Sequence, residues 1–305
     1  MAEPGLILVT GAGGGIGGVG RKVVALLRER GLNVRAMAHH DDDRADALRA
    51  LGADVVVGDL TRPADVATAL DSVQRMFFSM SLSPSYLEAV ATVATVARAV
   101  GDLDALVAMS QMTVSQMDAL SMSESHHQRL HWLSEQVLNW SGLPVVHLRP
   151  TLFLDNPLFT TVAAGSIASS GTIRLPFGTG RTSPVATGDV ARVVATVLAD
   201  PVPYLGMALE LTGPRSQDMN GVAEEYARAL GRPVSYVDIP PQTWAEQVLA
   251  RAGLGPYVDE HLLTMARLHR ENRYDRVTTT VEDITGQPAE SIESFIAQQK
   301  DLFTN

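Results

Sequence analysis

The sequence lacks cysteine, is poor in lysine and contains no long uncharged hydrophobic run. Without cysteine, the chain can form no disulfide bond, thiolate nucleophile or cysteine-ligated metal site. Its two lysines, Lys22 and Lys300, limit any chemistry that needs a catalytic ammonium group. The first residues, Met-Ala-Glu-Pro, resemble neither a signal peptide nor a membrane span, which predicts a cytoplasmic protein without membrane contact.

Clusters of basic residues are also missing. The formal net charge is −10, and no run of lysine and arginine could neutralise a phosphate backbone, so nucleic acid is not an expected partner. A chain of 305 residues suits one enzyme-sized α/β protein. A homodimer is left open.

Glycine is abundant directly after a short apolar run near the N-terminus. Residues 6–9 predict a buried strand, and the glycine-rich segment that follows leads into a helical pattern from Val19. A strand, a glycine turn and a helix start together present backbone N–H groups to phosphate, whereas a flexible surface loop is the alternative. Two sets of glycines fit a Gly-x-x-Gly-x-x-Gly spacing equally well: Gly11, Gly14 and Gly17, or Gly14, Gly17 and Gly20. We prefer the first set, because it follows the strand directly. The predicted phosphate-binding residues are Thr10, Gly11, Gly14, Gly15, Ile16 and Gly17.

Strand and helix patterns then alternate along the chain. Strands are predicted at residues 32–38, 54–57, 75–78, 105–109 and 145–150, with helices at 45–51, 64–71, 84–100 and 124–141. This alternation predicts an α/β fold with a doubly wound parallel Rossmann sheet. Ligands bind at the carboxyl ends of such strands, where Gly11, His39, Asp59, Ser79 and Ser110 fall.

The pattern changes after Pro150. A short strand at 173–176, a helix at 188–198, a strand at 208–211 and helices from residue 220 onward are expected. We therefore predict a dinucleotide-binding domain over residues 1–155, to which 184–213 return, and a smaller C-terminal substrate lobe over 156–305.

The end of the second strand is where a dinucleotide fold distinguishes its cofactors. An acidic side chain there binds the ribose hydroxyl of NAD, and a basic one accommodates the phosphate of NADP. This chain has His39 and His40, then three aspartates that are typical of a solvated loop and helix start, and then Arg44. The absence of an acid at the strand tip and the nearby arginine slightly favour NADP(H) over NAD(H), although imidazole lacks the forked charge of arginine.

Several motifs, in this order, resemble the NmrA-like branch of the atypical short-chain dehydrogenase/reductases. They are Val9-Thr10-Gly11-Ala12, Gly58-Asp59-Leu60, Leu148-Arg149-Pro150 and Gly188-Asp189-Val190-Ala191. The resemblance implies a Rossmann fold with a dinucleotide cofactor and places Asp59 and Leu60 near the adenine. It also implies that Ser79 and Met80, next to Ser81, lie along the cofactor, and that Phe153 and Asn156 lie near the nicotinamide and substrate.

Most short-chain dehydrogenases use a Tyr-x-x-x-Lys pair for proton exchange, which this chain cannot form. No tyrosine lies between Tyr86 and Tyr204. The resemblance places the two positions on His127 and His131. The pattern from His131 to Glu135 is similar to the His-x-x-Thr-Glu of the family's quinone and triphenylmethane dye reductases.

His127, His131 and Glu135 share one stripe of the predicted helix. A metal site, a structural role and a catalytic role all remain open, but no His-Glu-x-x-His motif is present and no metal is predicted. In the catalytic interpretation, His131 holds ribose or nicotinamide, and His127 or a water supplies a proton. Ser110 completes this catalytic set.

The methionine-rich stretch from 109 to 122 is interpreted as a substrate-facing loop rather than an ordinary one, with Met112 and the nearby Trp132 at the substrate. Our first hypothesis is an NAD(P)H-dependent reductase that transfers hydride to an apolar conjugated acceptor, such as a quinone or an aromatic polyketide. The alternative is a non-catalytic NAD(P)-sensing regulator that binds a protein partner.

Overall fold

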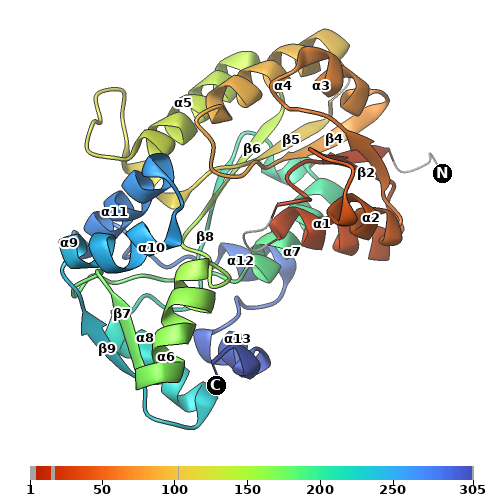
Figure 1. Cartoon of the computed structure of the whole chain (residues 1–305). Helices are drawn as coiled ribbons and strands as arrows, with labels where there is room; N and C mark the ends of the chain where they lie inside the picture. The colour runs from red at the N-terminus through yellow and green to blue at the C-terminus, as the bar shows by residue number, and fades with distance from the viewer. Residues whose placement is uncertain (1–4, 15–17, 102, 304–305) are drawn as a thin grey trace. The chain divides into compact units, whose positions relative to one another are not determined.

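The computed structural model describes residues 5–14, 18–101 and 103–303. A seven-stranded sheet has the order β3-β2-β1-β4-β5-β6-β8 (Figure 1). Neighbouring strands from β3 to β6 are parallel. The strands are β1 Leu6–Val9, β2 Val34–Ala38, β3 Asp54–Val57, β4 Val73–Phe78, β5 Ala105–Met109, β6 Val145–Pro150 and β8 Ala208–Leu211. The predicted doubly wound parallel Rossmann sheet is confirmed.

Helices cover both faces of this sheet. They are α1 Val19–Glu29, α2 Asp43–Ala50, α3 Pro63–Leu70, α4 Tyr86–Val100, α5 His126–Ser141 and α7 Thr187–Ala199. Figure 1 shows α3, α4 and α5 along one face and α1 and α7 along the other. The strand order reverses between β1 and β4, and a ligand cleft is expected at the carboxyl ends of these two strands.

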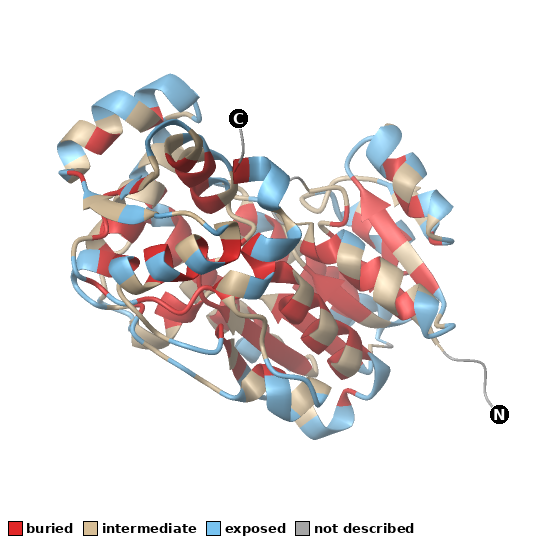
Figure 2. Cartoon of the chain, turned by 90° about the horizontal axis from the view of Figure 1, so that it is seen from below, coloured by how far each residue is buried: buried red, intermediate tan, exposed pale blue. Residues whose placement is uncertain are grey.

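Apolar residues at strand and helix periodicity account for this arrangement. Ile7, Leu8 and Val9 of β1 are almost completely buried, as are Met76, Phe77 and Phe78 of β4. Figure 2 shows buried residues concentrated in the strands and along one side of each flanking helix. The central strands therefore form a rigid base that fixes the loops at their ends.

The chain separates into two compact units. The first contains Met1–Val114, Arg129–Arg149 and Gly188–Leu209, and the second contains Ser115–Gln128, Pro150–Thr187 and Glu210–Asn305. The further elements are α6 Ala164–Ser170, β7 Thr172–Leu175, α8 Met219–Leu230, β9 Ser235–Asp238, α9 Pro241–Trp244, α10 Ala250–Ala252, α11 Pro256–Arg270, α12 Thr280–Thr285 and α13 Ile292–Gln298. The core of the second unit includes Phe177, Tyr226 and Trp244.

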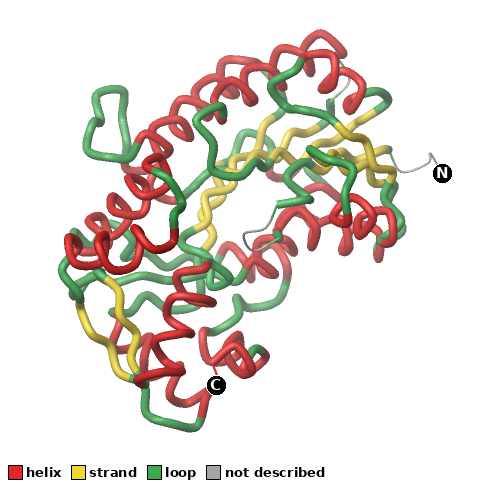
Figure 3. Tube along the Cα trace, viewed as in Figure 1, coloured by secondary structure: helices red, strands yellow, loops and turns green. Residues whose placement is uncertain are grey.

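A second, two-stranded sheet corrects one expectation from the sequence. β7 and β9 pair in parallel, whereas only helices were expected after residue 220 (Figure 3). The Tyr236 hydroxyl donates to the Leu175 carbonyl at 2.8 Å and accepts from the Phe177 N–H at 3.1 Å. These contacts hold β9 at the end of β7, a long-range pairing that local pattern does not reveal.

Two predicted helix starts shift for reasons of capping. The helix expected at 124–141 begins at His126, because the Ser125 hydroxyl accepts from the Gln128 N–H and the Gln128 side chain accepts from the Ser125 N–H. This reciprocal arrangement is a capping box. The helix expected at 45–51 begins at Asp43, after Asp42 caps it through the N–H groups of Arg44 and Ala45.

Candidate functional site

The glycine turn begins directly after β1. Gly11 has φ 68°, and a Cβ there would lie 2.6 Å from the Ser79 carbonyl oxygen. The Gly14 N–H donates to the Gly11 carbonyl at 3.1 Å, which closes the turn. Gly11 therefore has to be glycine for its conformation and for the close approach of β4. The predicted Gly15, Ile16 and Gly17 lie outside the described residues.

Thr10 joins the ends of β1 and β4 at the point where the strand order reverses. Its buried hydroxyl donates to the Ser79 carbonyl at 2.9 Å and accepts from the Ser79 N–H at 3.0 Å. Because the Thr10 hydroxyl and the Ser79 backbone satisfy each other's hydrogen bonds, the loops that follow β1 and β4 keep a fixed separation. Helix α1 starts at Val19, and its N-terminal dipole favours a bound anion.

A cleft of about 420 Å³ opens at these strand ends, entirely within the first unit. The predicted cofactor residues among its lining are Thr10, Gly11, Gly14, His39, Asp59, Leu60, Ser79, Met80 and Ser81. The volume and the mixture of backbone, hydroxyl and apolar lining suit part of a dinucleotide. The glycine turn fits phosphate, because Gly11, Gly13 and Gly14 line the cleft with backbone that carries no Cβ atoms.

The loop after β3 contributes a constrained carboxylate to this cleft. Asp59 Oδ1 accepts from both the N–H and the hydroxyl of Thr61, each at 2.8 Å. These hydrogen bonds, the one from the backbone first, hold the pKa of Asp59 below its usual value. Asp59 is therefore an ionised acceptor with one oxygen already used.

Past the end of β2, a carboxylate and a guanidinium both line the cleft. Arg44 Nε and Nη2 donate to Asp42 Oδ2 at 3.0 and 2.5 Å, and Arg44 Nη1 donates to the Gly13 carbonyl at 3.3 Å. The Arg44 side chain is the first cause that lowers the pKa of Asp42, to about 2. The strand tip itself has histidines, but an acid and a base follow within five residues.

At the end of β5, Ser110 enters a buried charged network. Its hydroxyl donates to Glu135 Oε1 at 2.6 Å, and Arg149 Nε and Nη2 donate to the two oxygens of Glu135 at 3.0 and 2.6 Å. The Glu135 side chain is 3% exposed. Arg149 thus balances the carboxylate, which in turn orients Ser110.

His131 is buried beside this network. Its ring centroid lies 4.1 Å from that of Tyr86, whose hydroxyl donates to the Met109 carbonyl at 2.6 Å. Burial, and then the charge of Glu135, raise the pKa of Tyr86. Tyr86 is therefore a buried, uncharged hydroxyl that donates to the Met109 carbonyl.

His127 has its contacts in the second unit. Its Nδ1 lies 2.9 Å from the Tyr257 hydroxyl, and its ring packs edge-on against His261. His261 Nδ1 lies 2.8 Å from the Ser125 hydroxyl, and burial lowers the pKa of His261 to about 4. The stripe predicted on the helix is thus divided: His127 has described contacts in the second unit, and His131 and Glu135 have theirs in the first.

The four predicted substrate residues occupy different settings. Met112 is buried at the start of a 3-10 helix over Met112–Gln116, and Trp132 is half-buried on α5. Phe153 forms an isolated bridge with Val185. The Asn156 side-chain oxygen accepts from the Leu158 N–H at 2.9 Å. That oxygen therefore stabilises the start of the π-helical segment Leu158–Ala163.

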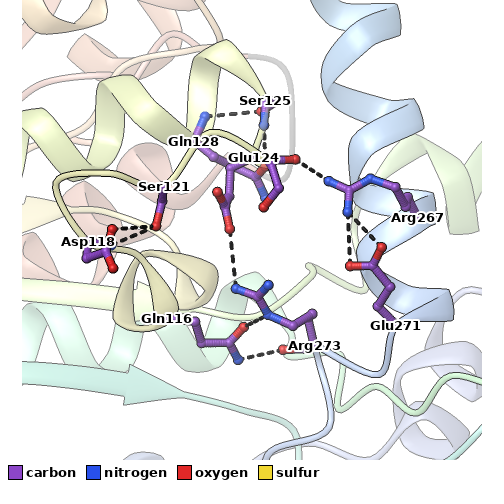
Figure 4. Close-up of polar contacts among 10 residues, drawn as sticks. Gln116, Asp118, Ser121, Glu124, Ser125, Gln128, Arg267, Glu271 and Arg273 are labelled. Atoms are coloured by element: carbon purple, nitrogen blue, oxygen red, sulfur yellow. Dashed lines mark hydrogen bonds and ion pairs between the residues drawn. The ribbon is translucent and has the colours of Figure 1, made fainter.

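Three arginines hold the segment 115–128 within the second unit. Arg273 binds Gln116 in both directions and contacts Glu124 Oε1 at 3.3 Å, while Arg267 donates to the Ser123 carbonyl (Figure 4). Arg276 donates to the Ser115 hydroxyl at 2.9 Å. Between these attachments, Leu120 and Met122 are 86% and 80% exposed. Only the part of the methionine-rich stretch that follows Gln116 therefore forms an exposed loop with fixed ends, whereas Met109 ends β5 and Met112 is buried.

Two classes of site are not found in the described part of the chain. Over residues 5–14, 18–101 and 103–303, no group of three or more His, Asp or Glu side chains could hold a metal ion. Within the same residues, no helix has both the length and the apolar character needed to cross a bilayer.

Some cleft residues were not predicted from the sequence. Asp42, Thr61, Ser83 and Ser85 all line the cleft. The repeated serines between 79 and 85 were a visible signal, because a polar run after a buried strand marks the edge of the sheet where ligands bind. Asp42 was interpreted as part of a solvated run, and its capping role could have been inferred from its place before a helix.

Comparisons with known proteins agree with this geometry. A sequence profile described as NAD(P)H-binding matches residues 14–201. An NAD(P)H azoreductase of Xenophilus azovorans is 29% identical over 292 residues, covering 95% of this chain and 96% of that protein. A (4-alkanoyl-5-oxo-2,5-dihydrofuran-3-yl)methyl phosphate reductase of Streptomyces griseus is 30% identical over 298 residues, covering 98% and 99%.

A solved structure supports the fold. The NADPH complex of the quinone oxidoreductase QOR2 from Escherichia coli superposes with a TM-score of 0.83 at 21% identity, covering 96% of this chain and 99% of that one. The resemblance noted from the sequence motifs is confirmed by these matches taken together. The prediction of a nicotinamide cofactor is likewise confirmed. The chain belongs to the NAD(P)H-binding family.

Proposed function

We propose that this protein is an NAD(P)H-dependent reductase that transfers hydride to an apolar, conjugated acceptor. The observation that carries the proposal is the cleft at the β1–β4 switch point, where the glycine turn and the loops after β2 and β3 meet in a family that binds NAD(P)H. Reduced nicotinamide supplies the hydride when it is bound. The residues of the chain hold the cofactor and control the proton.

The choice of acceptor rests on the relatives and on what the chain lacks. The relatives are named for an azo compound, an oxo-dihydrofuran and a quinone, each of which can delocalise charge gained with a hydride. Such acceptors need less assistance from a strong general acid than an isolated ketone does. A chain with neither tyrosine between Tyr86 and Tyr204 nor a nearby lysine suits them.

Three side chains are proposed to serve the reaction. Ser110, with its hydrogen directed to Glu135, presents oxygen lone pairs at the end of β5 and is suited to accept from an N–H or O–H donor. His131, packed on Tyr86, is proposed to hold ribose or nicotinamide. His127, paired with Tyr257, is proposed to supply a proton.

For the cofactor we propose acceptance of both dinucleotides with a modest preference for NADPH. Arg44 offers a guanidinium at the end of the cleft that follows β2. Asp42 offers a carboxylate in the same place, and no second arginine is among the cleft-lining residues described. A homodimer is a separate proposal that sedimentation can test.

The test is a turnover assay with purified protein. NADPH or NADH should be oxidised in the presence of a quinone, an azo dye or an unsaturated lactone, followed by the loss of reduced-nicotinamide absorbance. Gly11→Val should abolish this, because a side chain there would press on the Ser79 backbone and distort the glycine turn. Tight nucleotide binding without turnover of any acceptor would contradict the reductase and favour the regulatory alternative.

A further inference from the structure

The charged pair at the end of β2 bears on cofactor choice. Asp42 and Arg44 both line the cleft, together with His39 and His40. A ribose 2′-hydroxyl requires an acceptor such as a carboxylate, whereas a 2′-phosphate requires a cation. This chain places a carboxylate, Asp42, and a cation, Arg44, at the same end of the cleft, and the two form an ion pair.

Each of the three guanidinium nitrogens of the exposed Arg44 makes a hydrogen bond within the protein. Two of its guanidinium nitrogens donate to Asp42 Oδ2, and the third reaches the Gly13 carbonyl of the glycine turn at 3.3 Å. The Nε–Nη2 fork, one of the two edges that could bind a phosphate in bidentate fashion, holds Asp42. A phosphate can bind that fork only by displacing the carboxylate, and at the remaining N–H groups of Arg44 it shares the cation with Asp42.

Asp42 is not free to move away. Its other oxygen, Oδ1, accepts from the N–H groups of Arg44 and Ala45 at 3.0 and 3.4 Å and so caps α2. The neighbouring Asp41 is bound separately by Arg49 at 2.7 Å. The negative charge of Asp42 is therefore held at the edge of the cleft by the helix that it starts.

We propose that Asp42 is a specificity-determining residue: by holding the Arg44 guanidinium, it limits the preference for a 2′-phosphorylated cofactor and keeps the site open to both NADPH and NADH. This inference rests on the proposed function, since it concerns the same cleft. The pair is half-exposed, with side chains 37% and 58% accessible, so a phosphate can open it at little cost. The site is thus poised between the two cofactors.

The decisive variant is Asp42→Asn. Asparagine keeps the side-chain oxygen that caps α2 but removes the charge, and it releases Arg44. Calorimetric titration with adenosine 2′,5′-bisphosphate and adenosine 5′-monophosphate reports the phosphate preference without any turnover. Asp42→Asn should raise the ratio of bisphosphate to monophosphate affinity about tenfold. Arg44→Gln should lower that ratio, and the double variant should show no gain.

Asp43→Asn is the matched control, because it removes an equal charge at the next residue. The Asp43 side chain is exposed and does not line the cleft. An equal change in the two single asparagine variants would show a general charge effect and overturn the inference. An unchanged ratio in Asp42→Asn, with α2 intact by thermal unfolding, would also overturn it. Failure of the wild-type protein to bind either nucleotide would instead contradict the proposed cofactor site.

Discussion

Ser110 at the end of β5 donates its hydroxyl hydrogen to Glu135 on α5 over 2.6 Å. Because Arg149 donates to both oxygens of the same carboxylate, the network holds Glu135 in place and keeps the serine proton directed to it. A serine held in this way accepts a hydrogen bond more readily than it donates one. The geometry therefore assigns Ser110 the role of hydrogen-bond acceptor, whereas the sequence indicated only its position at the end of a strand.

Removal of the Glu135 charge should destabilise the protein strongly. In Glu135→Gln, the partly buried Arg149 loses its counter-ion, and the free energy of unfolding should fall by about 3 kcal/mol in urea denaturation. The control is Glu293→Gln, which breaks an exposed pair with Arg228 and should cost less than about 1 kcal/mol. Equal losses in the two variants would show that the buried network does not contribute as we infer.

The sheet was predictable because its strands carry their own signal. Residues 6–9, 54–57, 105–109, 145–150 and 208–211 match the observed strands, since short apolar runs bounded by polar or glycine residues leave little choice. The strand β9 was missed, because its stability comes from pairing with β7 about sixty residues away. The hydrophobic pattern of a segment indicates its local structural preference, but it does not indicate which distant strand the segment pairs with.

The candidate site was predictable to a similar extent. Cleft residues that directly follow a strand were found by their position. The Asp42–Arg44 pair was not, because a run of three aspartates looks solvated until the cap and the guanidinium are seen. The division of His127 from His131 was also invisible, since helical spacing places two residues on one face but does not identify what packs against each of them.

Arg273 should control the exposure of the segment that follows β5. Its removal in Arg273→Leu leaves Glu124, whose side chain is 3% exposed, without this cation and removes one of the two hydrogen bonds to Gln116, whose Nε2 still donates to the backbone carbonyl of residue 273 (Figure 4). We expect chymotrypsin to cleave near Leu120 and Met122 several-fold faster than in the wild type, because anchored loops resist proteolysis. The control is Arg228→Leu, which affects an exposed pair elsewhere and should leave the cleavage rate unchanged. Identical digestion of wild type and Arg273→Leu would contradict the anchoring role.

Gly20 should tolerate no side chain, although it lies within a helix. A Cβ at Gly20 would lie 2.8 Å from the Ala12 Cα, so Gly20→Ala should push α1 from the glycine turn and lower the free energy of unfolding by about 1–3 kcal/mol. A Cβ at Gly188 in α7 would meet open space instead. Gly188→Ala should therefore raise the free energy of unfolding by about 0.5 kcal/mol, because alanine has the higher helix propensity. Thermal unfolding of the two variants, and cofactor binding by Gly20→Ala, check the prediction. Stabilisation by both substitutions would show that the turn yields easily.

The last prediction concerns acid stability. His269 is completely buried between the rings of Phe177 and Tyr274, and its Nδ1 donates to the Met265 carbonyl at 2.8 Å. Burial lowers the pKa of His269 to about 4, only partly offset by this hydrogen bond. An unfolded histidine titrates near 6.5, so between these values the unfolded chain binds more protons and the free energy of unfolding falls as pH falls.

From pH 7 to pH 5, His269 alone should cost about 2 kcal/mol. His269→Phe keeps an aromatic ring between its two neighbours but cannot take up a proton. The variant should lose the hydrogen bond to Met265 at pH 7, yet its further loss on acidification should be about 2 kcal/mol smaller than that of the wild type. His261, whose pKa burial also lowers to about 4, is present in both proteins and cancels in the comparison. Urea denaturation at the two pH values measures the difference, and parallel losses in both proteins would show that His269 is not the buried neutral group that destabilises the fold in acid.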